Sequence, residues 1–413
     1  MVSINTTIVV SRFWPARGGS EMHSRSLALG LARSGHSLRV VCHSSDDKTT
    51  PELALTQQTS KSINDSGLYD IHRVCASGRL RCILQRIAKY HASCKIVRPM
   101  FDVLVRRLSR QSIVRSSSNA QVIHSIYNGL TSTAESSLAA ARELGIPFIW
   151  TPLACTTLPN GTGWSSMRFR KLYRQADAVI ALTDHERHWL ICQGADPERT
   201  FVCPMGPMVE APASQTEFRR RYGLTHSPVV LFLGRHDQHK GYQRVQQVMP
   251  LVWKHHPETQ FLFIGPQTSE SAKSFHNLSD SRVTMIEHIS QADKNAALAL
   301  CDFLCVPSSL ESLGVVYLEA WHYRKAVIAL EIPLLRTVIT HNVDGLLVKS
   351  GSTNLGDAIC HLLDYPEEAI SLGINGQQTV SERYSWPSII ERHEIIYRFA
   401  IENPRLNSQE TML

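Results

Sequence analysis

Short apolar runs alternate with longer amphipathic segments along most of the 413-residue chain. Apolar runs bounded by polar or turn residues are typical of strands that are buried on both faces. Helical segments between such strands are typical of parallel β-α-β units. In the first half of the chain, the predicted strands are Ile8–Val10, Leu38–Cys42, Val122–His124, Pro147–Trp150 and Ala178–Ala181.

The stretch 204–214, rich in proline, glycine and alanine, interrupts this pattern and predicts an interdomain linker. The alternation then resumes, with helical segments near 240–255, 291–300, 313–323 and 352–364. The strands predicted between them are Val229–Leu233, Phe261–Ile264, Val283–Ile286, Phe303–Val306 and Ala326–Ala329. The sequence therefore predicts an α/β protein with two Rossmann-like domains, residues 1–206 and 207–384.

The remaining composition features narrow the class of protein. No apolar stretch approaches the ~18–20 residues that a membrane span needs, and the first residues lack the basic start and long apolar centre of a secretory signal. We therefore expect a cytoplasmic protein. The polar segment 44–68 predicts a surface loop.

The cysteines and histidines do not predict a metal site. The ten cysteines include no CxxC pair, and Cys301 and Cys305 flank apolar residues, which favours reduced core thiols. His185 and His188 lack the spacing that places two imidazoles on one helical face. We expect His236 to be an exposed turn residue, and we expect neither a metal nor another cofactor.

Positive charge is concentrated between residues 71 and 120. This segment has eleven Lys or Arg residues and one acid, Asp102, whereas the whole chain has a net charge of +7. Within it, apolar residues follow helical spacing at Leu80, Ile83, Leu84, Ile87 and Ala88. Two interpretations stay open: docking on an anionic membrane surface, or a solvated basic face over an ordinary core stripe. The segment has few aromatic residues and no recognised nucleic-acid module, so we expect no nucleic-acid partner.

Three loops carry residues suited to binding a phosphorylated ligand, and each follows a predicted strand. Ligands of open parallel sheets bind beyond the carboxyl ends of the strands. In the first loop, Gly18 and Gly19 precede a helix, where the backbone could approach an anion closely. A plain tight turn would need the same residues.

The second loop, after Val229–Leu233, carries Arg235 and Lys240. Two cations at this spacing could converge on one diphosphate, with arginine contacting two oxygens and lysine acting as a point charge. Two ordinary solvated cations on a surface loop are the alternative.

The third loop, after Phe303–Val306, leads into a predicted helix that begins near Leu313, Gly314 and Val315. Free backbone N–H groups there would point at a phosphate. Glu311 and Glu319, eight positions apart, could accept hydrogen bonds from sugar hydroxyls. Each glutamate could also be an ordinary surface acid of a helix.

Taken together, these motifs resemble those of the GT-B-fold retaining glycosyltransferases of group 1, also called family 4. Gly234-Arg235 and Lys240-Gly241 resemble the GR…KG motif of that family, and Glu311 and Glu319 resemble its E-x7-E motif. Gly18 and Gly19 resemble its N-terminal glycine loop. The resemblance covers nearly the whole chain, and it implies that the helix within 385–413 crosses back onto the first domain.

The resemblance implies transfer of a sugar from a nucleotide-diphosphate donor, such as a UDP- or GDP-sugar, to a hydroxyl group with retention of anomeric configuration. It implies that Arg235 and Lys240 neutralise the leaving diphosphate without a metal, that Glu319 holds the ribose, and that Glu311 contacts the transferred sugar. Gly19, Gly314 and Val315 would cradle phosphate or sugar. The first domain would hold a glycan or lipid-linked acceptor, in polysaccharide or glycolipid biosynthesis at the inner face of a membrane.

The chain departs from the family pattern at several positions. Leu153 stands where many members have a histidine, Pro333-Leu334 replaces a Gly-Gly pair, Thr337 takes an acidic position, and Tyr323-Arg324-Lys325 lacks a turn glycine. These departures leave open a degenerate, non-catalytic nucleotide-sugar-binding partner subunit. A nucleotide-sugar epimerase or a phosphorylase on the same fold is a further alternative.

Overall fold

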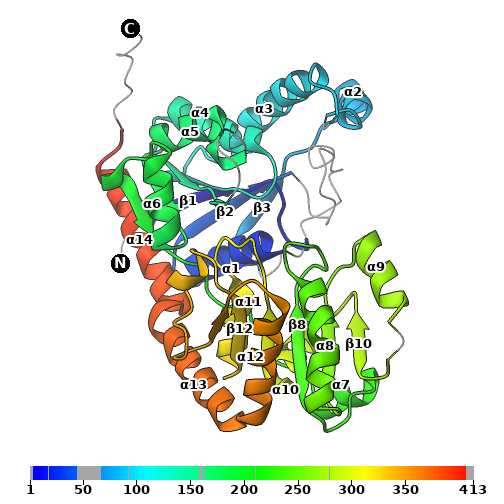
Figure 1. The fold of residues 1–413 in the computed structure, drawn as a ribbon. Coiled ribbons are helices and arrows are strands. Elements are labelled where there is room, and N and C mark those ends of the chain that lie inside the picture. Colours follow the sequence, from blue (N-terminus) through cyan, green and yellow to red (C-terminus); the bar gives the residue numbers. More distant parts are fainter. Residues whose placement is uncertain are drawn as a thin grey trace. The chain divides into compact units, whose positions relative to one another are not determined.

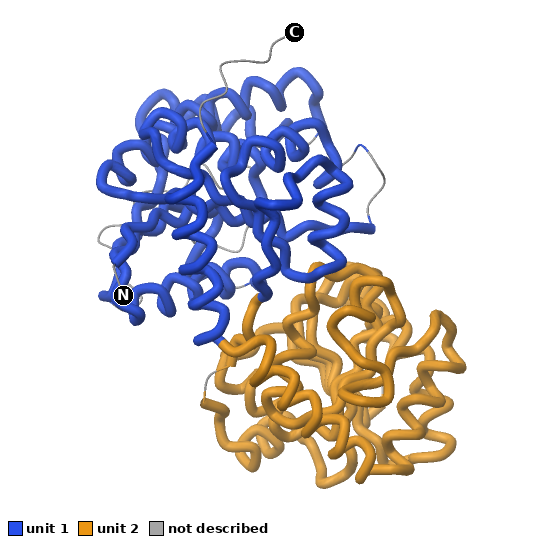
Figure 2. The backbone as a smooth tube through the Cα atoms, turned by 90° about the vertical axis from the view of Figure 1, so that its left-hand side faces the viewer, with its two compact units in different colours: residues 1–204, 386–413 blue, residues 205–385 orange. Residues whose placement is uncertain are grey.

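The structure, a computed structural model, describes residues 3–405 apart from 17, 44–66, 92, 158–160, 162, 210 and 279. The chain divides into two compact units, Met1–Pro204 with Trp386–Leu413, and Met205–Ser385 (Figure 2). Each unit contains one parallel sheet, so the predicted α/β class with two Rossmann-like halves is confirmed. Most of the predicted surface loop 44–68 lies outside the described residues.

The sheet of the first unit has the strand order β3-β2-β1-β4-β5-β6-β7 (Figure 1). Its strands are β1 (Asn5–Val9), β2 (Ser37–Cys42), β3 (Asp70–Arg73), β4 (Val122–Ile126), β5 (Phe148–Thr151), β6 (Ala178–Ala181) and β7 (Thr200–Val202). The helices before the crossover to the second unit are α1 (Gly19–Arg33), α2 (Gly78–Ala88), α3 (Val97–Ser116), α4 (Thr131–Leu144), α5 (Met167–Gln175) and α6 (Asp184–Cys192).

The central strands of this sheet are buried along their whole length, as continuous apolar runs in a parallel sheet require. Their side chains pack with those of the covering helices into one core, which includes Phe148 and Trp150 of β5 and Tyr173 of α5. His124 of β4 belongs to this interior: it is fully buried, and its two ring nitrogens lie 2.8 Å from the hydroxyl of Tyr397 and 2.7 Å from that of Thr151.

The last helix, α14 (Trp386–Glu402), follows the second unit in sequence but packs in the first. A Cβ atom at Gly30 of α1 would lie 2.4 Å from Cδ1 of Ile390, so glycine allows α1 and α14 to approach closely. Nε2 of His36 lies 2.9 Å from Oε1 of Glu394, and Nδ1 of the same ring accepts a hydrogen bond from the backbone N–H of Ile4. The expected return of the C-terminal helix to the first half is therefore observed.

The sheet of the second unit has the order β10-β9-β8-β11-β12-β13. Its strands are β8 (Val229–Leu233), β9 (Gln260–Ile264), β10 (Val283–Ile286), β11 (Phe303–Val306), β12 (Ala326–Leu330) and β13 (Leu346–Val348). Its helices are α7 (Gln215–Tyr222), α8 (Tyr242–His255), α9 (Ser269–His276), α10 (Gln291–Leu300), α11 (Val315–His322), α12 (Ser352–Asp364) and α13 (Pro366–Arg383).

Both sheets reverse their strand order at one point, between β1 and β4 in the first unit and between β8 and β11 in the second. Loops that leave neighbouring strands at such a point diverge to opposite faces of the sheet, and the crevice between them is the usual ligand site of this architecture. The loops with Arg235 and Lys240 and with Glu311 leave β8 and β11, so the topology brings these two motifs to the same crevice.

The basic segment 71–120 forms β3, α2 and α3. Leu84 and Ala88 of α2 are buried against Phe101 and Val105 of α3, and Leu80 and Ile87 pack against the same cluster. Four of the five stripe residues therefore form an ordinary core, whereas Ile83 is 47% exposed. Among the helices that the structure describes, none combines the length and the apolar character needed to cross a membrane.

Candidate functional site

The loops that follow β8 and β11 are joined by hydrogen bonds to one backbone carbonyl. The carbonyl of His239 accepts from the N–H of Ser309 at 2.8 Å and from the hydroxyl of Ser308 at 3.2 Å. A Cβ atom at Gly241, whose φ is +83°, would lie 2.4 Å from the carbonyl oxygen of Pro307. Glycine at 241 therefore satisfies two requirements, a left-handed backbone and close contact between the loops.

Lys240 and Glu311 form an ion pair across these loops. Nζ of Lys240 lies 2.6 Å from Oε1 of Glu311. The glutamate side chain is 6% exposed and the lysine side chain 28% exposed, so the carboxylate is nearly enclosed whereas the lysine remains accessible to solvent. Tyr317, also fully buried, has a pKa well above its ordinary value, mainly through burial and also because of the nearby charge of Glu311.

Arg235 has a different partner, Asp237. The guanidinium of Arg235 donates two hydrogen bonds to Oδ2 of Asp237, at 3.0 and 2.6 Å, and the other carboxylate oxygen accepts from the backbone N–H of Lys240 at 3.0 Å. One carboxylate thus contacts the guanidinium of Arg235 and the backbone of Lys240. Asp237 was not among the predicted site residues, although an acid between two cations of one motif is a usable signal.

Glu319, on α11, pairs with Lys294 of α10. Nζ of Lys294 lies 2.8 Å from Oε1 of Glu319 and 3.3 Å from the carbonyl oxygen of Met208. The glutamate side chain is only 7% exposed. Lys294 was likewise not predicted, because nothing in the local pattern of α10 distinguishes it from a solvated lysine.

The helix N-terminus predicted near Leu313, Gly314 and Val315 is confirmed: α11 begins at Val315, with Gly314 as its N-cap. Gly314 has a φ of +86°, and a Cβ atom there would lie 2.5 Å from the ring of Tyr317. The N-cap residue Gly314 has no side chain that could cap this helix, and N–H groups at such a helix N-terminus favour an anion. Leu313 is buried, and Val315 is the first helical residue.

Gly18 and Gly19 belong to the first unit, at the start of α1. A Cβ atom at Gly18 would lie 2.3 Å from Oε2 of Glu21, whereas one at Gly19 would meet no atom within 4 Å. Glu21 is buried, and its Oε1 lies 3.3 Å from Nε of Arg12. Of the predicted residues, those from 235 to 319 therefore share the second unit, and the two N-terminal glycines are in the other.

One histidine prediction in this region is wrong. His236 was expected to be an exposed turn residue but is fully buried, enclosed by the rings of Phe232, Tyr242 and Phe275. Burial lowers its pKa to about 4. The short turn passes beneath aromatic residues from later elements, which local sequence does not reveal.

Two departures from the family pattern occupy unusual backbone conformations. Leu153 has a φ of +51°, and Arg324 has a φ of +57° at the turn where a glycine was expected. The N–H next to Leu153, that of Ala154, donates to the buried carboxylate of Glu186 at 2.6 Å. Burial raises the pKa of Glu186 to about 7, although its hydrogen bonds from the Leu182 and Ala154 N–H groups oppose this shift.

The second unit matches the family model "Glycosyl transferases group 1" over residues 214–379. The first unit matches the model "Glycosyl transferase 4-like domain" over residues 18–206. Together the two models account for most of the chain and meet close to the boundary between the units.

Curated relatives are similar at moderate identity. The alpha-D-kanosaminyltransferase of Streptomyces kanamyceticus is 27% identical over 55% of this chain and 62% of its own length. The alpha-maltose-1-phosphate synthase of Mycolicibacterium smegmatis is also 27% identical, over 70% of this chain and 81% of its own. A GDP-mannose-dependent phosphatidylinositol monomannoside mannosyltransferase of Mycobacterium tuberculosis is 22% identical over 74% of this chain and 81% of its own length.

Solved structures share the fold. Sucrose-phosphate synthase from Thermosynechococcus elongatus superposes with a TM-score of 0.73 at 20% identity, covering 95% of this chain and 98% of the other. Anabaena HepE in complex with UDP and glucose gives a TM-score of 0.69 at 16% identity, with the same coverage. From the motifs, the two sheets and the two family matches together, we conclude that the chain belongs to the group 1 glycosyltransferases of GT-B fold.

Proposed function

We propose that this glycosyltransferase is a retaining, metal-independent enzyme that moves a sugar from a nucleotide-diphosphate sugar to a hydroxyl of a glycan or lipid-linked acceptor. The observation that carries the proposal is the contact between Lys240 and Glu311, 2.6 Å apart beyond neighbouring strands β8 and β11. Two similar proteins support such a donor: one mannosyltransferase is named as GDP-mannose-dependent, and the HepE structure contains UDP-glucose.

The leaving group of this reaction is a nucleotide diphosphate, whose negative charge grows as the glycosidic bond breaks. Lys240 and Arg235 supply positive charge at the crevice, and the N-terminus of α11 supplies N–H donors. Each cation also has a carboxylate partner, Glu311 or Asp237. A bound diphosphate competes with these carboxylates for the cations.

This competition gives Glu311 its role in the proposal. When the diphosphate attracts Lys240, the Glu311 carboxylate can accept hydrogen bonds from hydroxyls of the transferred sugar, beside its reacting carbon. Glu319, held by Lys294, is placed further along α11 to accept from the ribose hydroxyls. Lys294 therefore positions the glutamate, whereas Lys240 contacts the leaving group.

The experiment measures donor hydrolysis and sugar transfer by the wild type, Lys240→Ala, Glu311→Ala and a control, Lys254→Ala. Lys254 is an exposed lysine on α8 with no ion pair to any described residue. We expect each site variant to lose on the order of 10²–10³ in kcat, as for the loss of one donor to a developing anion, and the control to keep wild-type rates. Unchanged turnover in both site variants would contradict the assigned roles.

The donor and the stereochemistry are tested separately. Thermal shift with UDP-, GDP- and ADP-sugars identifies the base, and NMR of the initial product reports whether the anomeric configuration is kept. A requirement for inorganic phosphate, or reaction without an acceptor, would instead favour a phosphorylase or an epimerase.

The second candidate function is a non-catalytic nucleotide-sugar-binding subunit. Leu153 favours it, because this apolar, 8% exposed residue cannot supply the hydrogen bonds of the histidine that many members have there. Calorimetric binding of a nucleotide sugar without turnover across a panel of acceptors would support this candidate. A Leu153→His variant that turns over the donor faster than the wild type would show that the missing imidazole limits the reaction.

A further inference from the structure

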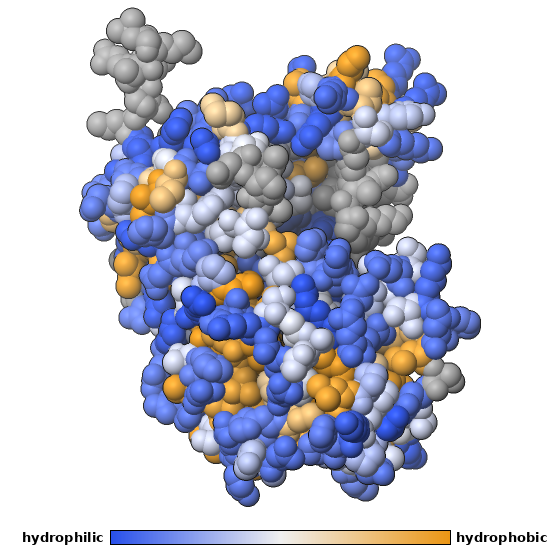
Figure 3. Space-filling view, in the orientation of Figure 1, coloured by the Kyte–Doolittle hydropathy of each residue, from blue (hydrophilic) through white to orange (hydrophobic). Residues whose placement is uncertain are grey.

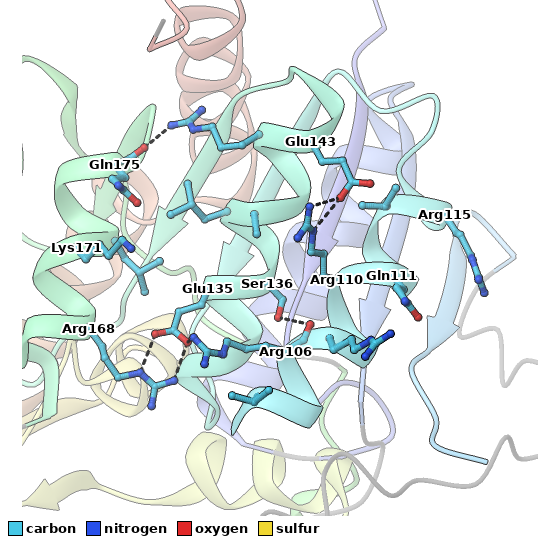
Figure 4. A pocket seen from close by; sticks show the side chains of 17 residues that line it. Arg106, Arg110, Gln111, Arg115, Glu135, Ser136, Glu143, Arg168, Lys171 and Gln175 are labelled. Carbon is cyan, nitrogen blue, oxygen red and sulfur yellow. Dashed lines mark hydrogen bonds and ion pairs between the residues drawn. The ribbon is translucent and has the colours of Figure 1, made fainter. Parts of the chain in front are cut away.

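A cavity of about 970 Å³ lies on the first unit above α4, between α3 and α5 (Figure 4). Small residues of α4, among them Ser136 and Ala139, form its floor. The long side chains on α3 and α5 rise on either side, so the recessed helix and its neighbours form a groove. We call this feature the α4 groove. It contains none of the residues assigned above to donor binding.

The α4 groove is strongly cationic. Seven Lys or Arg residues line it, against two carboxylates, those of Glu135 and Glu143. Arg168 donates two hydrogen bonds of 2.7 Å to Glu135, and Arg106 approaches the same carboxylate at 3.5 Å (Figure 4). Arg110 pairs with Glu143 at 2.8 Å. These pairs fix the geometry of the walls but leave the groove with an excess of positive charge.

Three of the cations have no counter-ion among the described residues. Arg107 and Arg115 on α3 and Lys171 on α5 make no hydrogen bond or ion pair with any residue that the structure describes, and all three are exposed. Like charges placed together repel one another, so such an arrangement is favourable chiefly when an anionic ligand neutralises it. Because the cations come from two helices, a ligand with several negative groups fits better than a single anion.

Exposed apolar side chains lie near the N-terminal ends of α3 and α5, and one of them, Val103, also lines the groove. Met100 and Val103 on α3 are 53% and 52% exposed, and Met167, the first residue of α5, is 75% exposed. Met100, Val103 and Arg107 follow one another at helical spacing, so one face of α3 changes from apolar to cationic along its length. Figure 3 shows hydrophobic residues among hydrophilic ones at the α2–α3 end of the first unit.

The helices place these features on one side of the unit. α4 connects the parallel strands β4 and β5, and α3 and α5 precede β4 and β6. All three helices therefore run antiparallel to the strands, and their N-termini lie at the same end of the sheet. The exposed Met100, Val103 and Met167 are thus neighbours at one rim, with the cations of the groove beginning one turn further along.

We propose that the α4 groove and its apolar rim are a docking site for an anionic membrane. Lipid phosphates enter the groove and contact Arg107, Arg115 and Lys171, while Met100, Val103 and Met167 enter the boundary between headgroups and acyl chains. Thioether and aliphatic side chains suit that boundary but do not form the aromatic platforms on which nucleic-acid bases stack. Docking on a membrane would bring the enzyme close to the lipid-linked acceptor of the proposed function. The membrane proposal rests on that function only for this role, and vesicle binding itself does not depend on it.

The test is co-sedimentation of the full chain with vesicles of phosphatidylcholine containing about one third phosphatidylglycerol. The variant Arg107→Gln/Arg115→Gln/Lys171→Gln removes the three cations without a counter-ion. Its matched control, Arg220→Gln/Lys254→Gln/Lys273→Gln, removes three exposed cations of the second unit and changes the net charge equally. A third variant, Met100→Ser/Val103→Ser/Met167→Ser, removes the apolar rim.

We expect the groove variant to lower the partition constant on the order of 100-fold, because each cation near an anionic surface contributes about fivefold. The control should keep wild-type binding, apart from the weak effect of net charge. The rim variant should weaken binding at all salt concentrations, whereas the groove variant should also reduce its salt dependence.

Several results would overturn the inference: equal binding to pure phosphatidylcholine vesicles, equal losses in the groove and control variants, or groove-dependent binding to duplex DNA without vesicle binding. Soluble glycerol phosphate that competes fully with vesicles would also contradict it, since the groove would then bind a free phosphate. Hydrolysis of a nucleotide sugar by the groove variant should equal that of the wild type. Failure of the membrane proposal is thereby separated from failure of the proposed function.

Discussion

Nζ of Lys294 lies 2.8 Å from Oε1 of Glu319, so the second glutamate of the E-x7-E motif has a cationic partner from the preceding helix. The carbonyl of Met208, near the start of the second unit, lies 3.3 Å from the same ammonium group. A lysine outside the motifs therefore connects the motif helix α11 to the chain segment that enters the second unit. Its removal leaves an acid that is 7% exposed without its counter-ion.

We expect Lys294→Met to lower the free energy of unfolding by about 2–3 kcal/mol, somewhat less than for a wholly buried pair because the lysine retains some solvent contact. Urea denaturation measures this loss. Glu319→Gln in the same background should restore part of the stability, because a neutral amide does not need a counter-ion. If the two substitutions are simply additive in a double-mutant cycle, the pair makes no net contribution.

Gly241 provides a second test, this time of the loop contact. Gly241→Ala should destabilise by at least about 2 kcal/mol, since the new Cβ adds a contact of 2.4 Å with the Pro307 carbonyl to the strain of a positive φ. It should also raise the KM for the donor, because Lys240 is the adjacent residue.

The matched control is Gly223→Ala. Gly223 also has a positive φ, +67°, but a Cβ atom there would meet no atom within 4 Å. Gly223→Ala therefore measures the cost of backbone strain alone. Equal losses of stability in the two variants would show that contact between the two loops contributes nothing.

Sequence pattern predicts those elements whose cause is local. The bounds of β8, β10 and β11 are those predicted, because each is an apolar run ended by turn residues. β3 was not predicted: alternate residues of this edge strand are exposed, and its sequence Asp-Ile-His-Arg has no apolar run. The three-residue strands β7 and β13 are too short for periodicity to identify.

The residues of the candidate site also divide into those that local sequence predicts and those that it does not. Residue type and spacing identified Lys240 and Glu311, because a strand followed by a loop defines where such residues lie. The partners Lys294 and Asp237 depend on which side chains meet in three dimensions. The burial of His236 depends on Phe275, which comes from α9, a distant element.

Substitutions at Arg324 test whether the positive φ at this departure from the family pattern destabilises the chain. Its φ of +57° costs about 1–2 kcal/mol for a residue with a Cβ atom, and glycine avoids this cost at the expense of about 0.4–1 kcal/mol of unfolded-state entropy. We expect Arg324→Gly to raise the melting temperature modestly. Arg324→Ala is the control, since it also loses the 2.8 Å hydrogen bond to Gln377 but keeps the strain; a gain in the alanine variant would contradict the backbone explanation.

Buried histidines in the first unit make its stability decrease at acid pH. Burial, with a smaller effect from His393, lowers the pKa of His23 to about 3. The unfolded chain, with a histidine pKa near 6.5, takes up this proton first, so stability is lost as pH falls below about 6.5 toward 3. The raised pKa of Glu186 has the opposite effect on stability as the pH falls. The contribution of His23 is therefore obtained by comparing the wild type with a variant that lacks only this histidine.

His23→Leu removes the ionisable group while keeping the position apolar. Between pH 6 and 4, its free energy of unfolding should fall less steeply than that of the wild type, by about 1.4 kcal/mol per pH unit for one proton. Urea denaturation at a series of pH values measures the slopes. His239→Gln, a substitution of an exposed histidine, should leave the slope unchanged. Parallel slopes for His23→Leu and the wild type would mean that His23 retains an ordinary pKa in the folded protein.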